Sequence, residues 1–211
     1  RIEICPTLKP DSTNLVLNSA VASLNLQSNM ALDELETVMI GALGKYFGKP
    51  DTLQLPPGKT LKLNADVTLT ERLRAFLLPG LNDLILDTIT ANYQSDNNTL
   101  ELSIRAPEIN YSNVIVDAFM LEVSGHEDSL RLEAGYENLR YDSLFTGPLV
   151  VSAHTGNAKV NSSVSLKSPD GQLRYLFRNT IDLSGDSTRI SLAENGLMLN
   201  TAEWEVPPEN A

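Results

Sequence analysis

The 211-residue chain contains a single cysteine, Cys5, and this scarcity excludes a fold held by intramolecular disulfides. The sequence also has no C-x-x-C pair and no Cys/His cluster with the spacing of a zinc site. The chain must therefore be stabilised by a hydrophobic core of its own. Its 42% hydrophobic and 20% charged residues are typical of a folded globular chain, and its length admits one large all-β domain or two smaller ones.

Basic residues are also scarce. Lys and Arg number 16 against 27 Asp and Glu, the formal net charge is -11, and no block of basic residues occurs. Such a chain would repel a phosphate backbone, so the sequence predicts no nucleic-acid partner. Electrostatic attachment to an anionic membrane surface is disfavoured for the same reason.

Long apolar runs and a leader segment are missing as well. Stretches such as 75–78 and 114–116 are far shorter than the about 20 residues that a spanning helix needs, so we expect no membrane span within this segment. The chain begins at Arg1 without a charged-then-apolar signal segment. We interpret it as a piece of a longer protein, and any anchor would lie outside it.

Residues that carry catalysis are few. The two histidines, His126 in a charged turn and His154 at a strand end, are not accompanied by a G-x-S-x-G nucleophile motif. Glycine-rich phosphate-binding loops are absent, and 96–98 lacks the glycine and distal glutamate of a calcium loop. The carboxylates fall in turns or on polar strand faces without a distinguishable pair. The sequence therefore predicts a protein that is not an enzyme and has no cofactor and no metal site.

One segment, residues 31–47, has a helical pattern. Asn29 is the expected N-cap, acidic residues fill the first turn, and Lys45 with Gly48 and Pro50 ends the helix. Apolar residues recur at spacings of three and four and form one stripe: Leu32, Leu35, Met39, Ala42, Leu43 and Tyr46. The helix either packs on a sheet or plugs its end, or it is an amphipathic gate or a dock for a partner.

The rest of the chain reads as strands. A Pro-rich break at 55–59 is followed by a period of two over 61–69, with odd-numbered apolar and even-numbered polar residues. Strands near 84–93, 99–106, 114–124 and 129–136 follow. Positive-φ dipeptides predict later hairpin turns at Gly156-Asn157, Asp170-Gly171, Gly185-Asp186 and Asn195-Gly196.

Similar apolar-polar pairs recur at a constant offset of thirty residues, beginning at Leu100, Leu130, Val160 and Ile190. Two strands and two turns occupy about that length. Either the alternating pattern produces this offset by chance, or the chain is a stack of hairpins that grows in one direction.

Such a sheet has one apolar face, and a large apolar patch is seldom left exposed. A second sheet, a helix or apolar ligand chains such as lipid acyl groups would cover it. An acyl chain would gain about 0.8 kcal/mol for each buried CH₂ group without any specific polar contact. A ligand-binding face of this kind needs no motif.

The strand-rich region resembles a known family. The segments "LKLNADVTL", "YQSDNNTLELSIRAPEINYSNVIVDAFMLEVSG", "DSLRLEAGYENLRYDSL" and "SGDSTRISLAENGLMLNTAEWEVPPEN" look like the repetitive β region of TamB/AsmA-like proteins of the Bacteroides type. In that family a strand-rich passage ends in a lone tryptophan near a Pro/Asn turn, as Trp204 does before Pro207, Pro208 and Asn210. The likeness covers 59–211, and the helix at 31–47 resembles an insertion between strands.

The resemblance implies a mainly β fold: an elongated antiparallel β-meander rolled into a half-pipe (a β-taco) with one amphipathic helix. Residues 1–58, an N-terminal strand and the helix, would belong to the same domain as the repetitive β region, 59–211. The parent protein would be periplasmic and anchored in the inner membrane of a Gram-negative bacterium. Its partners would be phospholipid acyl chains or outer-membrane β-barrel assembly components, and its role would be phospholipid transport, outer-membrane protein assembly or both.

The helix and the Pro-rich break depart from a continuous trough. The residues expected to line the apolar groove are Leu61, Leu63, Val67, Leu69, Leu100, Leu102, Ile104, Leu130, Leu132, Leu149, Val151, Val164, Leu166, Leu173, Tyr175 and Phe177. The alternative is a structural or adhesive β-sandwich module that binds a glycan or another protein subunit. A sandwich would hide these side chains between two sheets, whereas a trough leaves them open.

Overall fold

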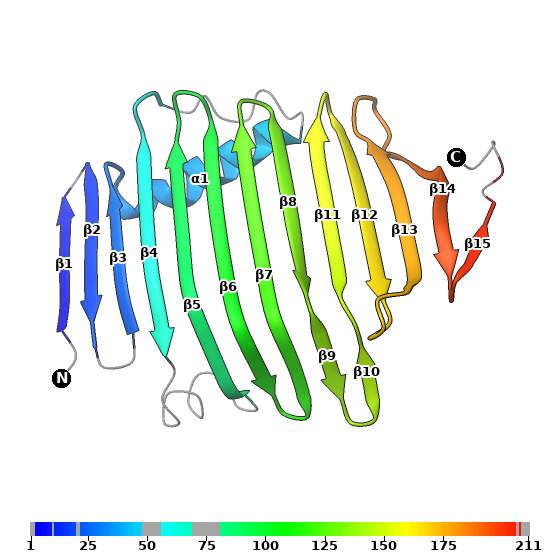
Figure 1. The fold of residues 1–211 in the computed structure, drawn as a ribbon. Helices are drawn as coiled ribbons and strands as arrows, with labels where there is room; N and C mark the ends of the chain where they lie inside the picture. The colour runs from blue at the N-terminus through cyan, green and yellow to red at the C-terminus, as the bar shows by residue number, and fades with distance from the viewer. Residues whose placement is uncertain are drawn as a thin grey trace.

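Hairpins follow one another along most of the chain in the computed structural model, which describes residues 3–9, 11–19, 22–47, 56–68, 81–205 and 207. The described residues form one helix and fifteen strands of a single antiparallel sheet (Figure 1). The elements are β1 (Glu3–Lys9), β2 (Ser12–Asn18), β3 (Ala22–Ser28), α1 (Leu32–Tyr46), β4 (Thr60–Thr68), β5 (Leu81–Gln94), β6 (Thr99–Tyr111), β7 (Val114–His126), β8 (Ser129–Tyr136), β9 (Asn138–Tyr141), β10 (Leu144–Thr146), β11 (Leu149–Gly156), β12 (Lys159–Lys167), β13 (Leu173–Asp182), β14 (Arg189–Leu199) and β15 (Ala202–Trp204).

Strands that are neighbours in sequence are neighbours in the sheet. Pairing runs in order from β1 to β8 and from β11 to β15, and β11 joins the two series by pairing with β8. The β9–β10 hairpin extends the same sheet, because β9 pairs with the far end of β7. The predicted β-meander is confirmed, and the sheet is open rather than closed into a barrel. Among the described residues no second sheet lies on it, so the β-sandwich architecture is wrong.

The two edges of the sheet are poorly suited to pairing with another strand. At one edge, β1 contains Pro6, which has no backbone N–H to donate. At the other edge, β15 is three residues long. Short edge strands and edge prolines both weaken edge-to-edge association. The faces of the sheet therefore offer more binding surface than its edges.

Cross-strand pairs lie on one face of a sheet, so the register shows which residues share a face. One continuous row consists of Leu63, Ala91, Leu102, Val123 and Leu132. The adjacent row on the other face consists of Asn64, Thr90, Ser103, Glu122 and Glu133. The sheet thus has one apolar face and one polar face, as the period of two over 61–69 predicts.

The thirty-residue offset has a structural basis. Leu100 pairs with Gly125, Gly125 with Leu130, Leu130 with Thr155 and Thr155 with Val160. The same row continues from Val160 through Ile181 to Ile190. Residues thirty positions apart therefore occupy equivalent places on the apolar face, two strands from one another.

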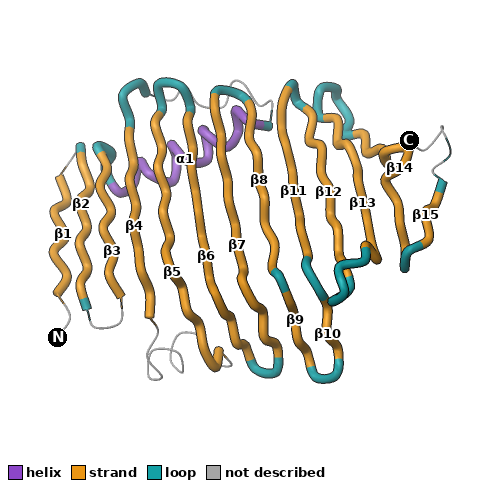
Figure 2. The backbone as a smooth tube through the Cα atoms, viewed as in Figure 1, coloured by secondary structure: helices purple, strands orange, loops and turns teal. Residues whose placement is uncertain are grey.

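Helix α1 crosses several strands of the sheet near the end that carries the β5–β6 turn (Figure 2). Its predicted extent is nearly correct, but Ala31 rather than Asn29 is the N-cap. Instead, the Asn29 side chain donates a hydrogen bond to the Gly58 carbonyl at 2.6 Å and accepts one from the Thr60 N–H at 2.7 Å. Asn29 therefore ties the helix start to the beginning of β4.

The compact core of the described residues lies between α1 and the apolar face. It is a cluster of buried side chains from the helix, from the residue before its N-cap and from three strands: Met30, Val38, Ala42, Tyr46, Tyr93, Leu100 and Leu130. The predicted single apolar stripe is only partly correct. Ala42 and Tyr46 are buried, but Leu32 and Leu43 are exposed, and Val38 and Gly41 are buried in their place.

One predicted turn is wrong. Asn195-Gly196 lies inside β14, at an irregularity where the register with β13 shifts. Gly196 is buried, and a Cβ atom at this position would lie 2.8 Å from the Arg178 carbonyl oxygen. The close approach of two backbones therefore explains this glycine, and the chain reverses later, at Asn200 and Thr201.

The predicted positive φ at Gly171 is confirmed, with a value of 85°. We expect Gly171→Val to lower the free energy of unfolding by about 1 kcal/mol or more, because a β-branched residue is strained in this region. Urea unfolding followed by circular dichroism would measure the change. Gly185→Val is the matched control, since Gly185 lies in an open loop without a positive φ. Equal losses for the two variants would contradict the prediction.

Candidate functional site

The predicted groove residues come together on the apolar face of the sheet, in four parallel rows. The rows follow from the strand registers. In order of increasing distance from the β5–β6 turn, the first row contains Leu61, Leu100 and Leu130, and the second contains Leu63, Leu102 and Leu132. The third row contains Ile104, Val151, Val164 and Phe177, and the fourth contains Leu149, Leu166 and Tyr175.

Three predicted residues do not join these rows. Leu173 pairs with Lys167 beyond an irregularity at the start of β13, where the alternation of faces is interrupted. Val67 pairs with Leu86 in the sheet, but its side chain lies outside the described residues. Leu69 lies outside them entirely.

Helix α1 divides the apolar face into a covered part and an open part. Leu100 and Leu130 are each 7% exposed because they lie under the helix. The prediction that these two side chains are open to a ligand is therefore wrong for the conformation seen here. The rows that run from β11 to β15 lie beyond the helix (Figure 1).

The C-terminal end of α1 is anchored by Tyr46. Its hydroxyl donates a short hydrogen bond to the Asn98 carbonyl oxygen, and the Asn98 side chain donates to the Glu127 carbonyl oxygen at 2.8 Å. Gly125 makes room for the phenol ring, because a Cβ atom there would lie 2.3 Å from the Tyr46 hydroxyl oxygen. Residues of two neighbouring turns therefore hold the end of the helix.

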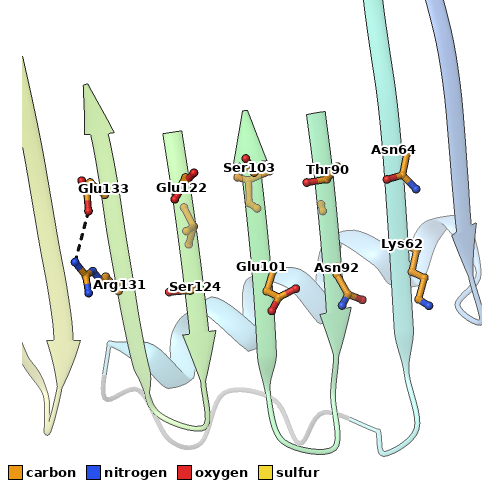
Figure 3. A pocket seen from close by; sticks show the side chains of 13 residues that line it. Lys62, Asn64, Thr90, Asn92, Glu101, Ser103, Glu122, Ser124, Arg131 and Glu133 are labelled. Atoms are coloured by element: carbon orange, nitrogen blue, oxygen red, sulfur yellow. Dashed lines mark ion pairs between the residues drawn. The ribbon is translucent and has the colours of Figure 1, made fainter. Parts of the chain in front are cut away.

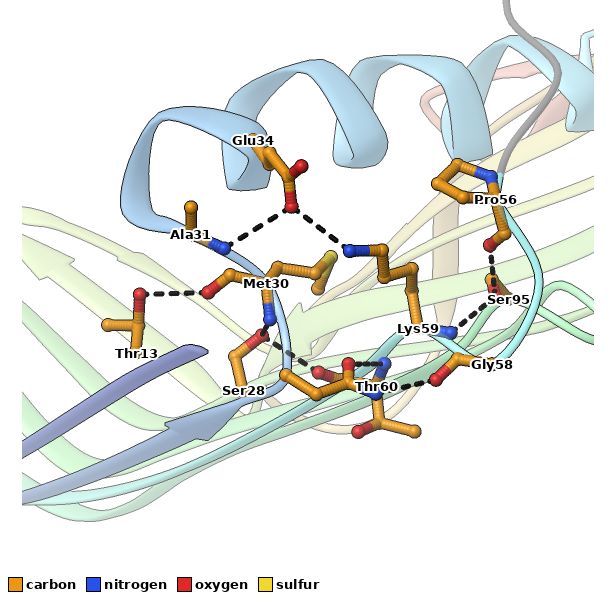
Figure 4. Close-up of polar contacts among 11 residues, drawn as sticks. Thr13, Ser28, Met30, Ala31, Glu34, Pro56, Gly58, Lys59, Thr60 and Ser95 are labelled. Carbon is orange, nitrogen blue, oxygen red and sulfur yellow. Dashed lines mark hydrogen bonds and ion pairs between the residues drawn. The ribbon is translucent and has the colours of Figure 1, made fainter. Parts of the chain in front are cut away.

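Polar contacts hold the N-terminal end (Figure 4). The Thr13 hydroxyl donates to the carbonyl oxygen of the buried Met30 at 2.9 Å. The Glu34 carboxylate accepts a hydrogen bond from the Ala31 N–H at 3.3 Å and forms an ion pair with the Lys59 ammonium at 3.1 Å. These contacts, the Lys59 hydrogen bond above all, lower the pKa of Glu34. The helix start is thus tied to β2 and to the segment before β4.

Two buried phenols under the helix differ in their partners. Burial raises the pKa of Tyr93 to about 12 and also raises the pKa of Tyr46, so both remain protonated at neutral pH. Tyr46 has the Asn98 carbonyl as acceptor, whereas no group among the described residues forms a hydrogen bond with the Tyr93 hydroxyl. A buried polar atom without a partner costs about 1–3 kcal/mol.

The open part of the apolar face presents large side chains to solvent. Phe177 is 41% exposed, Tyr175 is 46% exposed and Trp204 is 55% exposed. Trp204 pairs with Leu197, which pairs with Phe177, so the three strands β13 to β15 contribute to one surface. We call the exposed residues of this surface the open patch: Val164, Tyr175, Phe177, Ile190, Leu199 and Trp204.

The polar face contains a hollow of about 700 Å³ over β4 to β8. Figure 3 shows its side chains on the side of the sheet away from α1, with charges of both signs. Glu133 pairs with Arg131 at 3.5 Å, and Glu122 pairs with Arg105. The lining of the hollow has no aromatic residue, and three of its charged side chains, Glu122, Arg131 and Glu133, take part in these ion pairs.

A smaller hollow of about 500 Å³ lies next to it, where Ala118 has a φ of 54° and β8 leads into β9. Its lining includes Phe119, Met120 and Val150. It opens on the side of the sheet that carries Arg105 and Glu133, so the polar face also contains some apolar surface.

Within the described ranges, no three His, Cys, Asp or Glu side chains gather as a metal site. In the same ranges, no helix has the length and hydrophobicity to cross a membrane. The expectation that the protein is not an enzyme stays a prediction.

The sequence interpretation did not identify the residues of the sheet against which α1 packs. Tyr93 and Gly125 share a row with Leu61, Leu100 and Leu130, and both contact the core around Tyr46. A signal for Gly125 exists, because a glycine at an apolar position of an alternating strand marks a close approach by another group.

Comparison with protein-family models, with curated proteins and with solved structures finds no match.

The two phenols give a matched test of how the helix is held. We expect Tyr46→Phe to lower the free energy of unfolding by about 1 kcal/mol, because the buried Asn98 carbonyl loses its side-chain donor. Tyr93→Phe removes a hydroxyl without a partner, so it should leave stability unchanged or raise it. Denaturant titration of both variants measures the difference. A loss for Tyr93→Phe as large as that for Tyr46→Phe would show that the Tyr93 hydroxyl is satisfied.

Proposed function

We propose that this chain is a non-enzymatic segment of a periplasmic cell-envelope protein, and that its apolar sheet face binds phospholipid acyl chains. Its role would be to support phospholipid transport, outer-membrane protein assembly or both. The open patch carries the proposal: six large apolar side chains on β12 to β15 lie exposed on the apolar face, where the hydrogen-bonded pair of Ser162 and Asn179 is the polar interruption between their rows. The resemblance of 59–211 to the TamB/AsmA-like β region agrees with it.

The energetics of burial favour this use of the surface. Moving about ten methylene groups from water onto an apolar surface contributes about 8 kcal/mol. That value corresponds to a dissociation constant of about 1 μM, before the cost of ordering the ligand is subtracted. Weak, motif-free binding of this kind suits a surface over which lipids pass rather than one that stores them.

The chemistry of the face selects hydrocarbon over an extended peptide. β4 to β8 and β11 to β14 each pair with strands on both sides within the sheet, so its face offers no backbone partners to a client strand. A strand lying flat on the face would bury its own N–H and C=O groups without hydrogen bonds, at a cost of several kcal/mol. An acyl chain has no such groups, and its polar head can remain in water.

Two valines test the proposal. Val164 on β12 is 37% exposed on the apolar face, and Val150 on β11 is 40% exposed on the polar face. We expect Val164→Asp to reduce phospholipid that co-purifies with the protein by about fivefold or more, because a carboxylate would have to be desolvated beside the acyl chain. Val150→Asp adds the same charge to the neighbouring strand and should leave the lipid content unchanged.

Mass spectrometry of a chloroform extract, normalised to protein, measures lipid in both variants. Circular dichroism would check that both keep their strand content. Equal lipid content in Val164→Asp and the unsubstituted chain would contradict the proposal. An equal loss in both valine variants would mean that charge, not the apolar face, governs binding.

A further inference from the structure

Helix α1 has more apolar surface than the sheet covers. Val38, Ala42 and Tyr46 are buried against the strands, whereas Leu32 is 59% and Leu43 is 39% exposed. Ile40 and Phe47 are exposed as well. A helix that only covered the sheet would have polar residues at these exposed positions.

The exposed flank faces a definite direction. Glu34 binds Lys59, and Lys45 lines a hollow formed by the β5–β6, β7–β8 and β11–β12 turns, so both charged residues lie on the flank toward the turns. Leu43 follows Glu34 by nine residues, which is about two and a half turns of an α-helix. Leu43 therefore lies opposite Glu34, on the flank that faces away from the turns and along the strands.

The apolar face of the sheet continues on that side of the helix. The row next to the covered one contains Leu63, Leu102 and Leu132, all of them half-buried, and Ile104 lies in the row after it. The helix flank and these rows are two apolar surfaces that meet at an angle. We call them together the helix–sheet angle, formed by Leu32, Leu43 and Phe47 of the helix side and Leu63, Leu102 and Leu132 of the sheet.

We propose that the helix–sheet angle binds one acyl chain of a phospholipid, which lies alongside α1 and across the strands. The inference rests on the proposed function. It adds where the acyl chain lies, the direction in which it runs and the element, α1, that helps to bind it. Helix α1 is then a wall of the lipid-binding surface rather than only a cover over part of it.

The dimensions fit a single chain. The 15 residues of α1 span about 22 Å. The five strands from β4 to β8 span about 19 Å at the usual spacing between strands. Each leaflet of a bilayer core is about 15 Å thick, so an acyl chain of that length fits within the length of the helix.

Other occupants meet obstacles in the same place. A second copy cannot lay its sheet flat over the ends of β4 to β8 that α1 covers (Figure 2), because face-to-face sheets pack about 10 Å apart and α1, about 10 Å in diameter, fills that space. An extended peptide would leave its backbone groups unpaired, as on the open patch. An amphipathic helix of a partner satisfies its own backbone and is the competing outcome that the experiment must detect.

Photo-crosslinking tests the position of the chain. The probe is phosphatidylcholine with a diazirine midway along one acyl chain, incubated with the purified 211-residue protein, and crosslinks are mapped by peptide mass spectrometry. We expect crosslinks on α1 near Leu43 as well as on β12 and β13. Leu43→Asp should reduce the α1 crosslinks by about fivefold or more and leave those on β12 and β13 in place. Thr37→Asp, an exposed position on the polar side of the same helix, should change neither.

The outcomes separate the two proposals. Crosslinks on β12 and β13 with none on α1 in the unsubstituted protein would overturn the role of α1 and leave the proposed function standing. No specific crosslink anywhere would overturn both. Dimers that dissociate on Leu43→Asp, seen by light scattering, would assign the flank to a helix of a second copy. The map of the unsubstituted protein decides these points even if a variant fails to fold.

Discussion

Along the main sheet, apolar side chains pair mostly with apolar side chains, and the two-faced character of the molecule depends on this shared register. A slip of one residue in any strand would place its leucines among the lysines and glutamates of the opposite face. The irregularities within β13 and β14 are therefore tolerated only where the alternation resumes, as the pairing of Phe177 with Leu197 shows. Packing of α1 comes second, because Tyr46 finds its seat only if Tyr93, Leu100 and Gly125 stay in one row.

Much of the fold could be predicted from the sequence, because the alternation of apolar and polar residues is a local property of each strand. The odd-numbered face of β4, the extent of α1 along the chain and the offset from Leu100 to Leu130 all follow from spacing alone. The Asn195-Gly196 prediction was wrong for a non-local reason. The glycine there serves the approach of the Arg178 backbone from β13, and a dipeptide pattern cannot show what lies across the sheet.

The candidate site could be predicted only in part. Alternation identifies which side chains share the apolar face, so most of the expected groove residues lie in its rows. Alternation does not reveal which rows a helix covers, because that depends on where α1 docks. The docking is fixed by contacts far apart in sequence, such as Tyr46 with Asn98 and Thr13 with Met30. Leu32 and Leu43 fit the apolar periodicity of the helix but point past the sheet, which periodicity alone cannot distinguish from burial.

The equivalence of positions thirty residues apart makes the width of the molecule modular. Duplicating or deleting one such unit would widen or narrow the sheet by two strands, about 10 Å, while every remaining side chain keeps its face. The insertion or deletion of a single residue within a strand has the opposite effect, because it moves the side chains of that strand to the other face of the sheet. Sequences of this type can therefore change the width of the sheet by whole hairpins while the division into an apolar and a polar face stays the same.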